Sequence, residues 1–208
     1  MIRSISDFVP EGAEAGVGLN LQDDSGRYLF FLAGTRENCP PGELFYGGIG
    51  GHLEAGENWL GCAHREAIEE IGTDVEILPS SITWYVTKHG QVQQVELTDI
   101  PRPYAIYKML HPPGTPSEGN VYRIVIYKAC LGVNRIGEIP PDELQGVIAL
   151  TKEQLIRGLE RRPSLADLYG EGASLIAGGD NLDNQICVYP IGTAAALAHI
   201  LLHINEVS

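Results

Sequence analysis

The segment from Gly51 to Thr73, GHLEAGENWLGCAHREAIEEIGT, constrains the fold of this chain more than any other stretch. Its middle part, Asn58 to Ile71, has the composition of a helix, and Asn58 is a favourable N-cap residue. Gly72 follows as a natural C-terminal stop. The run Gly47 to Gly51 comes directly before and is too rich in glycine to be helical. The segment therefore predicts a flexible loop followed by a helix with defined ends.

The predicted helix has two distinct faces. At about 100° per residue, Glu66, Glu69 and Glu70 fall within an arc of about 100°. The adjoining arc is apolar and consists of Leu60, Ala63, Ala67 and Ile71. Like charges three or four residues apart cost about 0.2–0.5 kcal/mol per pair when they are only solvated. A hard divalent cation would reverse this cost, and carboxylate oxygens suit Mg²⁺ or Mn²⁺. The carboxylates alone leave open the alternative of an ordinary solvated acidic face.

The same segment resembles the Nudix box, GX5EX7REUXEEXGU, in which U is a bulky aliphatic residue. All seven fixed positions match, and they are Gly51, Glu57, Arg65, Glu66, Glu69, Glu70 and Gly72. Chance agreement at these positions is of the order of one in a million, which argues against the solvated face. Ala67 and Thr73 depart from the two aliphatic positions. These departures concern helix packing and leave the carboxylates unchanged.

Strand-like runs lie on both sides of the box. They are Val17–Leu21 and Arg27–Leu32, which read as a hairpin, then Asp74–Leu78, Ile82–Thr87, Gln91–Leu97, Tyr104–Leu110, Val121–Leu131 and Gly146–Leu150. Later helices are predicted over Thr151–Glu160 and Gly192–Ile204. This order predicts an α/β fold with a mixed β-sheet, and the resemblance implies a Nudix-like α/β/α sandwich. We expect one domain over residues 1–208, with a C-terminal helical elaboration from about 151 to 208.

The resemblance implies a role for each conserved box residue. Glu66, Glu69 and Glu70 are the expected ligands of Mg²⁺ or Mn²⁺, joined by the main-chain carbonyl of Gly50. Glu57 and Arg65 are expected to orient the loop and the ligands through a charge-assisted contact. The implied activity is hydrolysis of a diphosphate linkage in a nucleoside diphosphate derivative, by metal-activated attack of water.

Residues outside the box complete the expected site. Glu143 is the first candidate for a general base, ahead of Glu138 and Glu118, and Glu69 or Glu70 is the alternative within the box. Arg36 is a candidate contact to a substrate phosphate. Phe45 and Tyr46 could stack on a base as a minor alternative. Four other side chains are expected to be packed or otherwise structural, and they are His64, Trp59, His199 and His203.

The formal net charge of −13 limits the partners of the chain. Such a charge repels nucleic acid and anionic membrane surfaces, so neither is an expected partner. An anionic small molecule would be repelled too unless divalent cations lay between it and the protein. The four cysteines show no metal-ligand spacing, and we expect reduced thiols in a cytoplasmic protein. The resemblance also allows a homodimer.

Three alternatives to the favoured activity remain. One is a nucleoside triphosphate pyrophosphohydrolase, and another is a Nudix-fold module that senses a nucleotide without cleaving it. A third is an isopentenyl-diphosphate isomerase, which shares the fold but needs a catalytic cysteine such as Cys39. The proline that marks ADP-ribose pyrophosphatases about 15 residues after the box is replaced here by Lys88-His89-Gly90. The substrate subclass is therefore open, with a nucleoside diphosphate linked to another group favoured.

Overall fold

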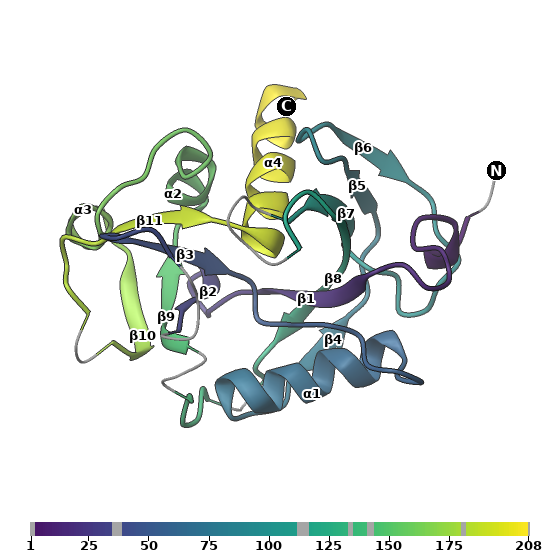
Figure 1. Cartoon of the computed structure of the whole chain (residues 1–208), viewed down its shortest axis with the longest axis horizontal. Coiled ribbons are helices and arrows are strands. Elements are labelled where there is room, and N and C mark those ends of the chain that lie inside the picture. The colour runs from purple at the N-terminus through teal and green to yellow at the C-terminus, as the bar shows by residue number, and fades with distance from the viewer. Residues whose placement is uncertain are drawn as a thin grey trace.

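The computed structural model describes residues 3–34, 39–111, 117–132, 135–140, 144–179 and 182–207. Two β-sheets lie side by side, with α1 (Trp59–Ile71) below them and α4 (Gly192–Val207) above in the view of Figure 1. One sheet consists of β1 (Ala15–Leu21), β4 (Glu76–Leu78), β5 (Thr83–Val86), β6 (Val92–Val95), β7 (Ala105–Leu110) and β8 (Val121–Cys130). The other consists of β2 (Tyr28–Ala33), β3 (Glu43–Gly47), β9 (Leu144–Leu150), β10 (Ser174–Gly178) and β11 (Cys187–Pro190).

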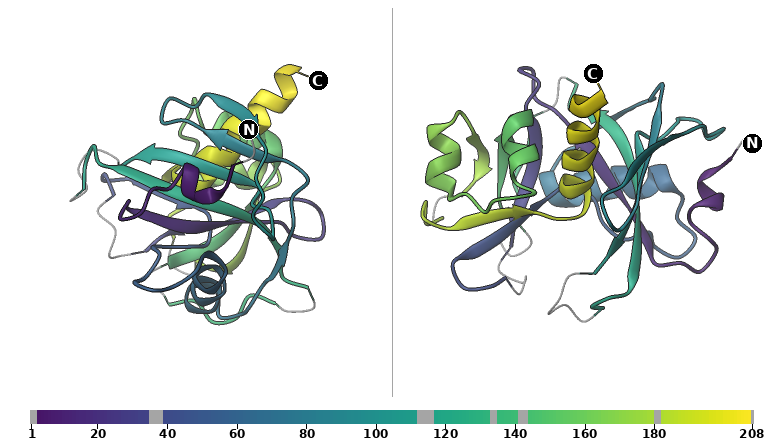
Figure 2. Two further views of the ribbon diagram at one scale, coloured as in Figure 1. Left: turned by 90° about the vertical axis from the view of Figure 1, so that its right-hand side faces the viewer. Right: turned by 90° about the horizontal axis from the view of Figure 1, so that it is seen from above.

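Three short helices complete the described part of the chain. They are the 3₁₀ helix η1 (Ile5–Asp7), α2 (Lys152–Arg157) and α3 (Leu165–Gly170). Figure 2 shows α2 and α3 at one end of the molecule and η1 at the other, with α4 between them. None of the helices in the described residues is long and apolar enough to cross a membrane.

Both sheets are mixed. β1 is parallel to β8 and β5 to β7, whereas β7 and β8 are antiparallel. In the other sheet β3 is parallel to β11 and antiparallel to β2. The predicted α/β fold with mixed strand pairing is confirmed. The strands divide between two sheets, where the sequence predicted one.

The predicted hairpin of Val17–Leu21 with Arg27–Leu32 is wrong, although both strands exist. β1 pairs with β8, and β2 pairs with β3 and β9. All seven residues of β1 are buried, so this strand needs neighbours on both edges and cover on both faces. Its second edge is lined by the loop that precedes α1, since Val17 N–H donates to the carbonyl of Gly51 and Leu19 N–H to that of Ile49. The fold thus places the glycine-rich loop against a central strand.

Two apolar cores lie on opposite faces of β1. The α1 core contains the buried face of α1, namely Cys62, Ala63, Ala67 and Ile71, packed on Val17, Leu19 and Leu21 of β1 and on Val147 and Ala149 of β9. The α4 core contains the Ala- and Leu-rich face of α4 with Phe30, Tyr46, Ile124 and Val188. The predicted C-terminal packed helix is confirmed, and it continues three residues beyond Ile204 to Val207.

The region after residue 151 holds strands as well as helices. β10 pairs with β9, and β11 adds to the edge of β3 in parallel register, Cys187 opposite Glu43 through Pro190 opposite Tyr46. The chain then enters α4, whose Thr193 is buried against two glycines. A Cβ atom at Gly18 would lie 1.9 Å from Thr193 Oγ1, and one at Gly48 would lie 2.6 Å from Thr193 Cβ.

Candidate active site

Helix α1 has the ends that its sequence predicts. The Asn58 side chain accepts hydrogen bonds from the N–H groups of Leu60 and Gly61, at 3.1 and 2.9 Å. Gly72 closes the helix in the left-handed region, at φ 64°, and its N–H donates to the carbonyl of Ile68. These caps satisfy backbone groups at both ends of the helix. The acidic residues of α1 are therefore carried on a rigid element with fixed ends.

The loop before α1 needs glycine for two different reasons. Gly50 has φ 140°, and a Cβ atom there would lie 2.2 Å from the carbonyl oxygen of Val17. A Cβ atom at Gly51 would lie 2.3 Å from Oε1 of Glu66 and 2.6 Å from its Oε2. The backbone at Gly51 thus lies closer to the Glu66 carboxylate than it could if residue 51 had a side chain.

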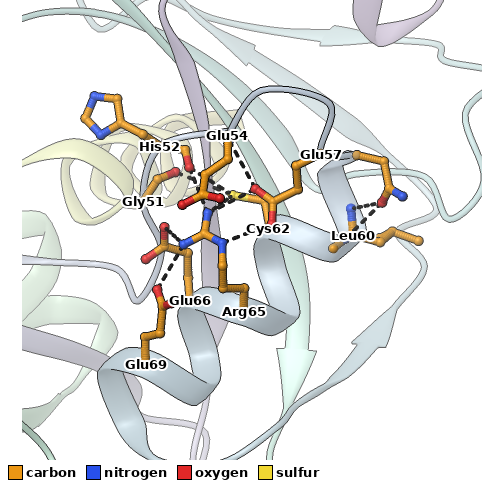
Figure 3. Close-up of polar contacts among 11 residues, drawn as sticks. Gly51, His52, Glu54, Glu57, Leu60, Cys62, Arg65, Glu66 and Glu69 are labelled. Carbon is orange, nitrogen blue, oxygen red and sulfur yellow. Dashed lines mark hydrogen bonds and ion pairs between the residues drawn. The ribbon is translucent and has the colours of Figure 1, made fainter.

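Arg65 lies at the centre of a charged network between α1 and the loop, as Figure 3 shows. Its Nε and Nη2 donate to the two carboxylate oxygens of Glu57, both at 3.0 Å. Its Nη1 donates to Glu66 Oε1 at 2.8 Å and to Glu69 Oε2 at 2.9 Å. A two-point contact between a guanidinium and a carboxylate is strong and directional. The hydrogen bonds from Arg65 hold the pKa of Glu57 at about 2.

The three box carboxylates expected to bind metal differ in their surroundings. Glu66 is only 9% exposed, and burial raises its pKa even though Arg65 acts in the opposite direction. Glu69 is exposed on the outer side of the helix. Glu70 accepts a hydrogen bond from the N–H of Gly50 at 2.8 Å through Oε2. Glu66 and Glu70 therefore contact Gly51 and Gly50, while Glu69 reaches the same region through Arg65.

Cys62 contacts the loop as well, a role that the sequence did not predict. Its buried thiol donates to the carbonyl oxygen of His52 at 3.5 Å, and Arg65 Nη2 donates to the same oxygen at 3.0 Å. Burial raises the Cys62 pKa to about 12, so the thiol keeps its proton. Cys62 precedes Arg65 by three residues, a spacing that places both on one side of a helix and is the signal that could have revealed it.

The donor set suits a hard divalent cation. Three box glutamates, Glu57, Glu66 and Glu69, contact the Arg65 guanidinium, and Glu70 adds a fourth carboxyl group beside Gly50, so acidic groups outnumber the one basic group. Oxygen ligands and excess negative charge are what Mg²⁺ and Mn²⁺ require. No group of three or more His, Cys, Asp or Glu side chains in the described residues is already arranged as a metal cage. Glu66 and Glu69 instead share Arg65 as a hydrogen-bond donor, each through one carboxylate oxygen.

Two predicted site residues, Arg36 and Glu143, lie outside the described residues. Glu138 is exposed, and its backbone packs on Gly72 at the end of α1. Glu118 is exposed in the turn between β7 and β8. Of these candidates for the general base, Glu138 lies next to the C-terminal end of α1 in the described structure.

The remaining side chains have structural surroundings. Tyr46 is buried in the α4 core, and Phe45 is a partly buried residue packed against the same core. His64 is not packed as expected, because its half-buried ring contacts the carboxylate of Asp74 at 2.5 Å just beyond α1. Trp59 packs against the α1 core and Cys39 against the α4 core. The ring of His203 meets the ring of Trp84 edge-on.

Comparison with known proteins gives the following similarities. Residues 13–167 match the sequence profile of the NUDIX domain. A NUDIX hydrolase from Nitrosomonas europaea is 20% identical, with 63% of this chain and 64% of that one covered and a TM-score of 0.36. A C. elegans Ap4A hydrolase is 16% identical, with coverages of 70% and 85% and a TM-score of 0.42. A MutT protein from Methanosarcina mazei Go1 is 13% identical, with coverages of 78% and 91% and a TM-score of 0.43.

The chain spans slightly less than two thirds of the Nitrosomonas protein. No curated protein matches its sequence.

Proposed function

The chain belongs to the NUDIX domain family, and from this premise we propose that it is a Mg²⁺- or Mn²⁺-dependent hydrolase of a nucleoside diphosphate derivative. The observation that carries the proposal is the arrangement around Arg65. One guanidinium binds both oxygens of Glu57 and also contacts Glu66 and Glu69, directly beside the loop that contains Gly50. An ordinary solvated acidic face has no need of a helix arginine and a close-packed glycine loop.

In the proposed site, Glu66, Glu69, Glu70 and the carbonyl of Gly50 would hold the metal. When bound, Mg²⁺ or Mn²⁺ offsets the charge of a diphosphate and lowers the pKa of an attacking water. Glu57 and Arg65 fix the position of Glu66 relative to the loop. The Cys62 thiol also contacts the loop by donating to the carbonyl oxygen of His52. Side chains that are held by further hydrogen bonds lose little freedom on binding a cation.

The reaction adds water across a phosphorus–oxygen–phosphorus linkage. The water oxygen forms a bond to one phosphorus, the bridging oxygen leaves with the other, and one water proton must be removed. We propose that Glu143 is the general base that removes this proton, and that Arg36 contacts a phosphate of the substrate. Glu69 or Glu70 would remove the proton if Glu143 does not.

A substrate screen tests this function. The purified full chain is incubated with nucleoside diphosphate derivatives and with nucleoside triphosphates, each with Mg²⁺, with Mn²⁺ and with excess chelator, and the released phosphate species are identified. We expect cleavage at the diphosphate linkage of at least one nucleoside diphosphate derivative, and none with chelator. Preferential cleavage of triphosphates would replace the proposed substrate class. Tight nucleotide binding without cleavage would support the sensing module instead.

A further inference from the structure

We propose that Lys108 and Arg123 form a binding site for a phosphate group, apart from the box carboxylates. The site goes beyond the proposed function, because it stands on its own contacts and does not require the box to cleave anything. We call these two residues the cation pair. They lie on neighbouring strands of one sheet, Lys108 on β7 and Arg123 on β8.

Strand register places the two positive charges directly opposite each other. In the antiparallel pairing of β7 with β8, Lys108 is the partner of Arg123. The N–H of Arg123 donates to the carbonyl of Glu14, at the other edge of β8, so it does not point at β7. Lys108 and Arg123 are therefore a pair without hydrogen bonds between their backbones, the kind whose Cα atoms lie only about 4.5 Å apart. Their side chains start close together on the same face of the sheet.

The cation pair has no acidic partner. Within the residues that the structure describes, neither side chain forms an ion pair or a hydrogen bond. Arg27, Arg65 and Arg162, by contrast, each form an ion pair with a carboxylate. Like charges directly opposite each other on two strands destabilise a sheet. The chain has 27 acidic and only 14 basic residues, so two adjacent cations without a carboxylate indicate a site for an external anion.

The cation pair lies at the edge of the α1 core. Ile106 and Val125, its neighbours on the same face of the sheet, are fully buried in that core, whereas Lys108 and Arg123 are only half-buried. Apolar surroundings lower the effective dielectric constant, which strengthens both the repulsion between the two charges and their attraction for an anion. A phosphate held between the two side chains would replace this repulsion by charge-assisted hydrogen bonds to both.

A phosphate group suits the cation pair better than other anions do. A guanidinium offers two N–H groups to two phosphate oxygens, and an ammonium adds a compact positive charge. Two cations also match the double negative charge that a terminal phosphate carries. The net charge of −13 repels large polyanions such as nucleic acid, so the phosphate belongs to a small molecule.

The cation pair is close to the loop before α1. Arg123 lies opposite Ala15 on β1, and the carbonyl of Ala15 accepts a hydrogen bond from the N–H of Leu53, two residues after Gly51. Two strand spacings therefore separate Arg123 from the loop, a distance of about 10 Å across the sheet. A small molecule whose diphosphate lies at the box would reach the cation pair with a further phosphate group.

Methionine substitutions test the cation pair, because methionine keeps an unbranched apolar stem but removes the charge. The full chain is unfolded thermally with inorganic phosphate or with chloride at equal ionic strength, and excess chelator prevents phosphate from binding through a metal. We expect phosphate to raise the wild-type melting temperature more than chloride does. Lys108→Met and Arg123→Met should each bind phosphate roughly 10- to 100-fold more weakly. Lys88→Met and Arg161→Met are matched controls, since both positions are exposed.

The repulsion within the cation pair gives a second readout. Without phosphate and at low ionic strength, Lys108→Met should melt at a higher temperature than the wild type, because it removes the like charge opposite Arg123. With phosphate, the order of the two melting temperatures should reverse. An equal response to phosphate in the wild type and in both variants of the pair would overturn the site. A wild type that phosphate stabilises no more than chloride does would overturn it too.

Kinetics distinguish a phosphate of the substrate from that of a separate ligand. If the substrate supplies it, KM rises in both variants of the pair, and inorganic phosphate competes with the substrate less well than in the wild type. If a separate ligand supplies it, KM is unchanged, and phosphate alters wild-type turnover without competing, a response that both variants lose. If the wild type cleaves nothing, the proposed function fails, and phosphate binding alone judges the cation pair.

Discussion

The carboxylate of Glu66 lies in the space that a side chain at Gly51 would need, with Oε1 2.3 Å from the position of a Cβ atom. We therefore predict that Gly51→Ala displaces either the loop or the carboxylate and lowers kcat/KM by about 100-fold. Steady-state kinetics with the substrate from the screen measure this. Gly170→Ala is the control, because a Cβ atom there meets nothing within 4 Å. Equal activity of the two alanine variants would contradict the prediction.

Neutral replacements test the proposed metal ligands. Glu66→Gln and Glu70→Gln keep the shape of the side chain but remove its charge, so we expect turnover to fall by several orders of magnitude. Circular dichroism should show an unchanged fold, and isothermal titration should show weaker binding of Mn²⁺. Glu160→Gln, at an exposed position after α2, should change neither quantity. Wild-type turnover in both ligand variants would remove them from the site.

Arg65 and Glu57 should behave as one unit, because a single two-point contact joins them. Arg65→Lys and Glu57→Gln each break that contact, and lysine cannot reproduce the paired donors of a guanidinium. We expect each variant to lower the melting temperature and kcat/KM, and the double variant to lose little more than either single one. A double-mutant cycle measures the coupling. Fully additive losses would show that the two side chains act independently.

Helix α4 is packed so tightly on β1 that two small residues depend on each other. A Cβ atom at Gly18 would lie 1.9 Å from Thr193 Oγ1 but 3.1 Å from Thr193 Cβ. Gly18→Ala should therefore lower the free energy of unfolding by about 1–3 kcal/mol, as overpacked cores do. Adding Thr193→Ala should recover part of this loss, because it removes the clashing oxygen. Urea unfolding measures both effects, and a double variant no more stable than Gly18→Ala would refute this packing.

The stability of the chain should depend on pH through His199. Burial lowers the pKa of His199 in the folded protein below its usual 6.5, and the ring lies against Gly90 in the turn between β5 and β6. The unfolded chain then takes up a proton at higher pH than the folded one does. The contribution of neutral His199 is thus present above about pH 6.5 and is lost as the pH falls toward the folded value.

Thermal unfolding across this range measures the effect. We expect His199→Gln to flatten the fall in melting temperature between about pH 7 and about pH 5. His89→Gln is the control, since His89 is exposed in the same turn. If the flattening appeared in the control variant rather than in His199→Gln, the assignment to His199 would be wrong.

Sequence alone predicted the parts of this molecule that depend on local pattern. The limits of α1, its caps at Asn58 and Gly72, and the contact of Arg65 with Glu57 all follow from residues close together in the chain. The strand partners of β1 could not be predicted in this way, because strand pairing joins residues that are far apart in sequence. β3 was missed since its five residues run directly into glycines, and β11 was missed because its only described strand partner is β3.

The site shows the same division. The box residues could be predicted because their chemistry and spacing are both local. The contact of Thr193 with Gly48 could not be predicted, since Thr193 lies 145 positions later in the chain and is brought there by the packing of α4. The ring contacts of Phe45 with Phe31 and Tyr189 also depend on the register between strands, so the sequence could not predict them.

The pairing of β11 with β3 has a consequence for any shortened form of this protein. A chain cut after residue 167, where the NUDIX match ends, would lose β11 and leave the outer edge of β3 with unsatisfied N–H and C=O groups. Bare sheet edges recruit strands from other molecules, so such a fragment would self-associate into aggregates even though it retains every box residue. The forty-one residues after position 167 therefore also protect the edge of β3, the strand that leads into the glycine-rich loop, from pairing with other molecules.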